Sequence, residues 1–137
     1  MPSEASKTIL VVEDVDAVRK MVCVVLRQHG YRCLEAVDGT DALRLLDDQP
    51  IHLLLTDVKM PKMGGTELAR HVADRTPGTR ILFMSGYSDD PAIGSIRQMP
   101  EMFLAKPFTP AALAQAVRQS LDHPWPGLPD HGHLSTQ

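Results

Sequence analysis

Five side chains capable of chemistry stand directly after apolar segments of the sequence. Glu13 and Asp14 follow one such segment, Asp57 follows a second, Ser85 a third and Lys106 a fourth. An acid or a lysine in a loop is usually only a solvated charge, so each residue alone carries little information. It is much less probable that all five residues follow apolar runs by chance, so we expect them to form one shared site.

The residue types in this set favour phosphoryl chemistry with a divalent cation. Carboxylates brought close together repel one another, and oxygen ligands without His or Cys favour Mg²⁺ over zinc. We therefore predict that Glu13 and Asp14 hold Mg²⁺ beside Asp57, which accepts a phosphoryl group as the nucleophile. Lys106 would neutralise phosphoryl oxygens and Ser85 would hydrogen-bond another of them.

The segments that must position these residues alternate between strand and helix patterns. Solid apolar runs such as Ile9 to Val12 indicate strands covered on both faces. Asp38-Gly39 is predicted to be a turn, and residues 58–65 a loop, from their Gly and Pro content. We expect strands over 8–12, 31–37, 51–56, 80–84 and 102–105, and helices over 15–26, 42–46, 67–75, 90–98 and 110–121.

This alternation predicts an α/β fold with a parallel sheet and helices on both faces. In such sheets, functional residues lie beyond the carboxyl ends of the strands, which is where the five side chains fall. We expect one domain over residues 7–122, after a disordered N-terminus at 1–6. The Pro- and Gly-rich residues 123–137 are predicted to form a flexible tail.

Composition excludes several classes of function. The net charge of −3 and the small number of aromatic residues argue against direct nucleic-acid binding. No segment resembles a signal peptide, and none reaches the roughly 20 apolar residues of a membrane span, so we expect a soluble, cytoplasmic protein without membrane insertion. Cys23 and Cys33 are expected to be buried thiols, because two cysteines cannot form a secreted disulfide framework.

The motifs around these residues resemble the receiver domain of bacterial two-component response regulators, of the single-domain chemotaxis type and of hybrid kinases. The resemblance rests on residues 11–14, 56–65, 84–86 and 106–108, in that order, and covers about residues 7–121. It implies a flavodoxin-like, doubly wound five-stranded parallel sheet of order 2-1-3-4-5. It also implies that a sensor histidine kinase or a histidine phosphotransfer protein donates the phosphoryl group to Asp57.

The resemblance further assigns individual roles. It implies that Asp14, Asp57 and the backbone carbonyl of Lys59 ligate Mg²⁺ directly, and that Glu13 acts through a water. It implies a cis Lys106–Pro107 bond.

Phosphorylation would draw Ser85 inward, and Phe103 would turn into the vacated space as a switch residue; the competing interpretation of Phe103 is a core aromatic. The change would reach a downstream protein target through the face formed by residues 90–98, 102–105 and 110–121.

Several alternatives remain open at this stage. A flavin mononucleotide protein would need a Ser-, Thr- or Gly-rich phosphate loop, where this chain has Glu13-Asp14. A Mg²⁺-dependent phosphatase would need a second Asp two residues after Asp57, where Lys59 stands, so we expect no enzyme activity beyond the chain's own phosphorylation and dephosphorylation. The chain could also be a degenerate receiver that only binds partner proteins, or the receiver fragment of a hybrid histidine kinase.

Overall fold

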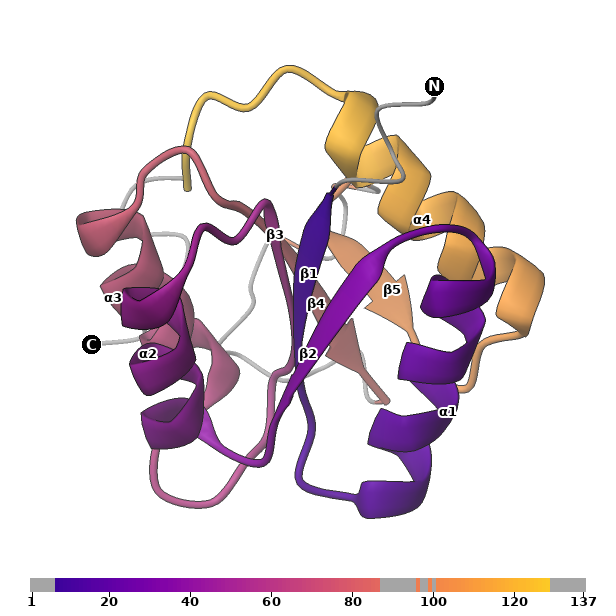
Figure 1. The fold of residues 1–137 in the computed structure, drawn as a ribbon, viewed down its shortest axis with the longest axis horizontal. Helices are drawn as coiled ribbons and strands as arrows, with labels where there is room; N and C mark the ends of the chain where they lie inside the picture. The colour runs from indigo at the N-terminus through magenta and orange to yellow at the C-terminus, as the bar shows by residue number, and fades with distance from the viewer. Residues whose placement is uncertain (1–6, 87–95, 97–98, 100, 129–137) are drawn as a thin grey trace.

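The computed structural model describes residues 7–86, 96, 99 and 101–128, which contain five strands and four helices (Figure 1). The helix expected over 90–98 falls almost wholly outside these described residues. The strands are β1 (Thr8–Val12), β2 (Arg32–Ala36), β3 (Leu53–Asp57), β4 (Arg80–Ser85) and β5 (Phe103–Ala105). The helices are α1 (Asp16–Gln28), α2 (Gly39–Asp48), α3 (Gly65–Arg75) and α4 (Pro110–Asp122).

The five strands form a parallel sheet of order β2-β1-β3-β4-β5, which confirms the predicted flavodoxin-like topology. Helices α1 and α4 cover one face of the sheet, and α2 and α3 cover the other (Figure 1). Alternate residues of β1 divide between the two resulting cores: Ile9 and Val11 face α1 and α4, and Leu10 and Val12 face the opposite side. All five residues of β1 are buried, as the solid apolar run predicted.

Two helices begin earlier than the sequence pattern suggested. The predicted turn Asp38-Gly39 is instead the start of α2, because the Asp38 carboxylate accepts a hydrogen bond from the backbone N–H of Asp41 and acts as an N-cap. The predicted loop 58–65 ends one residue sooner, since α3 starts at Gly65. The cap at Asp38, rather than apolar periodicity, decides where α2 begins, whereas Gly64 at the start of α3 makes no side-chain cap.

The expectation of a flexible tail over 123–137 stays a prediction for residues 129–137, which lie outside the described part of the chain. The preceding residues contact the domain. Trp125 donates a hydrogen bond from Nε1 to the carbonyl of Pro77 at 3.0 Å, and Trp125 and Leu128 pack against the core on the α2 and α3 side. Cys23 and Cys33 are free and buried, as predicted.

No helix among the described residues has the length and apolar character that a membrane crossing requires.

The start of α3 lies directly against the backbone of Asp57. The Gly65 N–H donates to the carbonyl of Val58 at 2.8 Å, and a Cβ added at Gly65 would lie 2.1 Å from the carbonyl oxygen of Asp57. Real Cβ atoms do not approach backbone so closely, so only glycine lets the helix pack there. The absence of a side chain at Gly65 therefore allows the backbone of Asp57 to lie directly against the start of α3.

We expect Gly65→Ala to lower the free energy of unfolding by about 1–3 kcal/mol, because the new methyl group must displace the Asp57 backbone. Urea unfolding followed by circular dichroism measures this. Gly78→Ala is the matched control: an added Cβ there meets nothing within 4 Å, and its stability should stay equal or rise slightly. Equal midpoints for the two variants would contradict the expected crowding.

Candidate functional site

The register of the parallel sheet brings the predicted chemical residues to one edge. Val12 lies opposite Thr56, Asp57 opposite Met84, and Ser85 opposite Ala105. The residues at or just beyond these pairs are Glu13 and Asp14 after β1, Asp57 at the end of β3, Ser85 at the end of β4 and Lys106 after β5. The sheet therefore collects at its carboxyl edge the set that the sequence suggested.

The three acids are close enough to share a cation. One carboxylate oxygen from each of Glu13, Asp14 and Asp57 lies within 4.8 Å of the other two. Glu13 is fully buried, Asp57 is half-buried and Asp14 is exposed, so the cluster opens to solvent on the Asp14 side. A donor set made only of oxygen atoms, with one exposed and one half-buried carboxylate, fits Mg²⁺, which keeps several waters when it binds.

Glu13 is held in place at both ends of its carboxylate. Oε1 accepts a hydrogen bond from Lys106 Nζ at 2.8 Å, and Oε2 accepts one from the backbone N–H of Val15 at 3.1 Å. With both oxygens already bonded, Glu13 is less available as a direct metal ligand than Asp14. This arrangement is compatible with the indirect role that the sequence resemblance implied for Glu13.

Lys106 connects Glu13 and Asp57. Its Nζ lies 2.8 Å from Glu13 Oε1 and 3.2 Å from Asp57 Oδ2. Burial alone would lower the pKa of Lys106, but the hydrogen bonds and charges of Glu13 and Asp57 outweigh burial and raise the pKa above its ordinary value. The ammonium therefore stays charged at neutral pH beside the carboxylate that is the candidate phosphoryl acceptor.

At Asp57, in contrast, the effect of burial on the pKa outweighs that of the ion pair with Lys106. Partial burial raises the pKa of its carboxyl, the charge of Glu13 raises it further, and Lys106 only partly counteracts both. The charged form of Asp57 is thus less stable in the fold than in water, and it would gain from any further cation placed beside it.

The other predicted residues take different places. Ser85 is buried at the end of β4, and its carbonyl accepts a hydrogen bond from the Lys106 N–H at 2.9 Å. Lys59 is exposed in the loop after β3. Phe103 is half-buried beside Phe83 in the sheet register and packs against the core on the α2 and α3 side. The Lys106–Pro107 bond is cis, as the resemblance implied.

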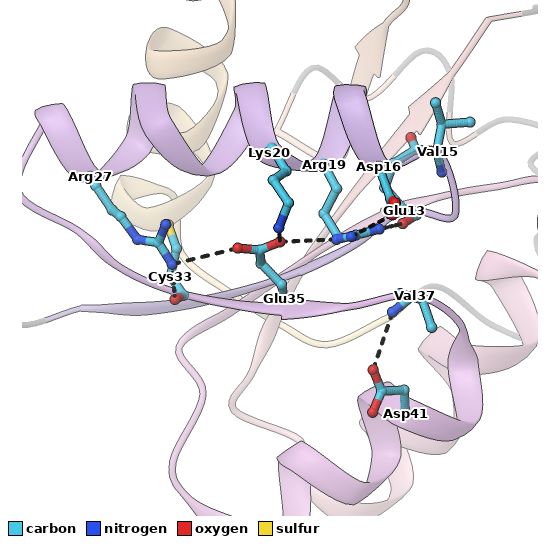
Figure 2. A network of polar contacts seen from close by, with 10 residues as sticks. All are labelled: Glu13, Val15, Asp16, Arg19, Lys20, Arg27, Cys33, Glu35, Val37 and Asp41. Carbon is cyan, nitrogen blue, oxygen red and sulfur yellow. Dashed lines mark hydrogen bonds and ion pairs between the residues drawn. The ribbon is translucent and has the colours of Figure 1, made fainter.

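A polar network next to the site was not anticipated from the sequence (Figure 2). Arg19, on α1, is buried and donates to the backbone carbonyl of Glu13 at 2.9 Å and to Glu35 Oε1, on β2, at 3.0 Å. The available signal was its position: Arg19 precedes Val22, Cys23 and Leu26 by three, four and seven residues. These spacings place a charge on the buried face of the helix.

An apolar groove of about 450 Å³ adjoins the site. It is lined by Val18 and Met21 of α1, by Gly86, and by Lys106, Pro107 and Phe108 after β5. Met21, which lines the groove, is 39% exposed, and Val15, which directly precedes α1, is 51% exposed. The groove is an exposed apolar surface directly beside Lys106.

Comparison with known proteins agrees with this arrangement. A family model described as the response regulator receiver domain matches residues 9–118. Sensor kinase CckA of Brucella abortus is 34% identical over 120 residues, covering 85% of this chain but only 13% of the kinase. The response regulator receiver protein CpdR of the same organism is 37% identical over 82 residues, covering 60% of this chain and 68% of that protein.

Solved structures show the same fold. The receiver domain of hybrid histidine kinase CckA is 36% identical with a TM-score of 0.70, covering 84% of this chain and 99% of that domain. A receiver domain protein from Clostridium thermocellum is 28% identical with a TM-score of 0.75, covering 85% and 94%. The family match over residues 9–118 shows that the chain belongs to the response regulator receiver domain family.

Proposed function

We propose that Asp57 of this phosphorelay receiver accepts a phosphoryl group from a sensor histidine kinase or a histidine phosphotransfer protein. The observation that carries the proposal is the placement of Lys106 Nζ within hydrogen-bonding distance of both Glu13 and Asp57, at the strand edge where three carboxylates converge. A positive charge fixed beside a carboxylate that is half-buried and open to solvent suits transfer of an anionic group to that carboxylate.

In the proposed reaction an oxygen of Asp57 attacks the phosphorus of a phosphohistidine. The new P–O bond forms an acyl phosphate, the P–N bond breaks, and the imidazole leaves with the bonding electron pair and takes up a proton. Lys106 would pair with one phosphoryl oxygen, and the Ser85 hydroxyl would donate a hydrogen bond to another. Asp14, Asp57 and the backbone carbonyl of Lys59 would hold Mg²⁺, which would supply charge neutralisation at the transferred group.

The groove beside the site supports a docking role for the donor. A histidine-bearing donor must approach the sheet edge above Asp57, and the exposed Val15 and Met21 with Phe108 offer apolar contact area there. Apolar surface around a charged site supplies binding energy, while the charges fix orientation. We therefore place the donor over α1 and the segment after β5, with transfer taking place in the cytoplasm.

The output is proposed to run through Ser85 and Phe103. Phosphorylation would move Lys106 and Ser85 toward the new group, and Phe103, the first residue of β5, would change its packing. A downstream protein would read the changed face of β5 and α4, together with residues 90–98, most of which lie outside the described part of the chain. With Lys59 two residues after Asp57 and exposed, we expect no steady turnover of added phosphate esters.

Phosphorylation itself is the first prediction of this proposal. Incubation with Mg²⁺ and acetyl phosphate should add one phosphoryl group by intact mass, and chelation of Mg²⁺ should abolish the gain. Asp57→Asn should show no gain, whereas Asp48→Asn, a matched change at an exposed acid of α2, should behave as wild type. Lys106→Met should slow the reaction about tenfold or more, because a charge-assisted contact to the transferred group is lost. A phosphorylated Asp57→Asn protein would overturn the assignment.

A second prediction concerns stability. Because the pKa of Asp57 is higher in the fold than in the unfolded chain, the folded state binds more protons between these two pKa values, and stability falls as pH rises through that window. At neutral pH the charged carboxylate therefore opposes folding. Asp57→Asn should raise the free energy of unfolding in EDTA by on the order of 1 kcal/mol.

Urea unfolding with and without Mg²⁺ checks both halves of this expectation. Mg²⁺ should stabilise the wild type by mass action and should stabilise Asp57→Asn much less, since a ligand has been lost. An Asp57→Asn variant less stable than wild type in EDTA would show that Lys106 compensates the buried charge fully, contrary to the direction of the Asp57 shift.

A further inference from the structure

We propose that Arg19 is a positioning residue for the metal site, which acts by holding the carbonyl oxygen of Glu13 and so orienting the Asp14 side chain. The inference rests on the proposed function, because it concerns Mg²⁺ binding at the same acids. It adds to that function a residue that touches neither the cation nor the phosphoryl group.

The guanidinium of Arg19 is fixed at each of its three nitrogens (Figure 2). Nη1 donates to the Glu13 carbonyl at 2.9 Å, Nη2 to Asp16 Oδ1 at 2.6 Å and Nε to Glu35 Oε1 at 3.0 Å. The residue is only 5% exposed. A planar fork with every nitrogen bonded has one orientation, so the donor aimed at Glu13 is held rigidly.

Glu13 is correspondingly fixed at every polar atom. Its N–H donates to the carbonyl of Ala36 at 3.2 Å, its carbonyl accepts from Arg19, and its carboxylate contacts Val15 and Lys106. The carbonyl of Glu13 and the nitrogen of Asp14 belong to one planar peptide. Fixing that carbonyl therefore sets the direction in which Asp14, the exposed member of the acidic cluster, leaves the backbone.

The Nε atom of Arg19 bonds to Glu35 on β2, which fixes the guanidinium to the sheet. Glu35 lies opposite Val11 in the register of β1 and β2, and it also contacts Lys20 at 3.3 Å and Arg27 at 3.9 Å. The hydrogen bond from Arg19 is the main reason that the pKa of Glu35 lies below its ordinary value. Glu35 thus stays charged at neutral pH, and Arg19 ties the start of α1 to the strand next to the site.

The charge of Arg19 and its positioning role predict opposite effects of its removal on Mg²⁺ affinity, so an experiment can distinguish them. Arg19 is a cation close to the site, so its charge alone repels Mg²⁺, and removing that charge would strengthen binding. If Arg19 holds the Glu13–Asp14 peptide in place, its removal would instead weaken binding. A residue that contributes only to stability would lower the urea midpoint and leave the affinity of the folded protein unchanged.

The experiment compares Arg19→Met with Lys20→Met by titrating the ¹⁵N-labelled protein with MgCl₂ and following amide resonances. Lys20→Met is the matched control, because Lys20 is the next residue, loses the same charge and also contacts Glu35, but has no bond to Glu13. We expect the Mg²⁺ Kd of Arg19→Met to rise about tenfold, and that of Lys20→Met to stay equal or fall slightly. The spectra themselves report whether each variant is folded.

Arg19→Lys covers the case in which Arg19→Met fails to fold. It keeps the charge but offers one donor group in place of a fork, so its Kd should rise several-fold in a folded protein. Affinity of Arg19→Met or Arg19→Lys equal to or tighter than that of Lys20→Met, with the wild type binding Mg²⁺, would overturn the positioning role alone. A wild-type protein whose resonances do not respond to Mg²⁺ would overturn the proposed metal site and this inference with it.

Discussion

The mutual repulsion of Glu13, Asp14 and Asp57 is the constraint around which this molecule is organised. A five-stranded parallel sheet brings the carboxyl ends of β1 and β3 together, and the acids that follow these strands lie within 4.8 Å of one another. Lys106, delivered by β5 from the far side of β4, lies between two of them. The strand order and the segment that follows β5 therefore place the Lys106 ammonium beside the carboxylates that follow β1 and end β3.

Much of this could be read from the sequence because burial on two faces leaves a strong pattern. Each of β1 and β3 is an apolar run ended by an acid, and parallel strands with crossover helices permit few arrangements. The charged residues of the site then follow from one rule, that function in such sheets lies beyond the carboxyl ends. The family resemblance supplied what residue types cannot, namely the strand order and the cis bond before Pro107.

What could not be predicted depends on side chains that meet across elements. The sequence spacing of Arg19, Glu35 and Glu13 does not predict that one guanidinium bonds to residues of two neighbouring strands. The one indication in the sequence is a charged residue on the apolar face of a helix. The start of α3 at Gly65 depends on a close approach to the Asp57 backbone, and that of α2 on a carboxylate cap. Both features depend on packing or capping contacts, which the local periodicity of apolar residues does not predict.

The contact between Trp125 and Pro77 has a practical consequence. Trp125 is the one tryptophan of the chain, and its indole is bonded at the turn that precedes β4, on the edge of the sheet opposite the acids. Its fluorescence therefore senses whether the segment after α4 lies on the domain and whether the core is intact. The same indole is too remote to be quenched directly by an ion among the acids. The molecule thus carries an optical reporter of its folding that is insulated from its chemistry.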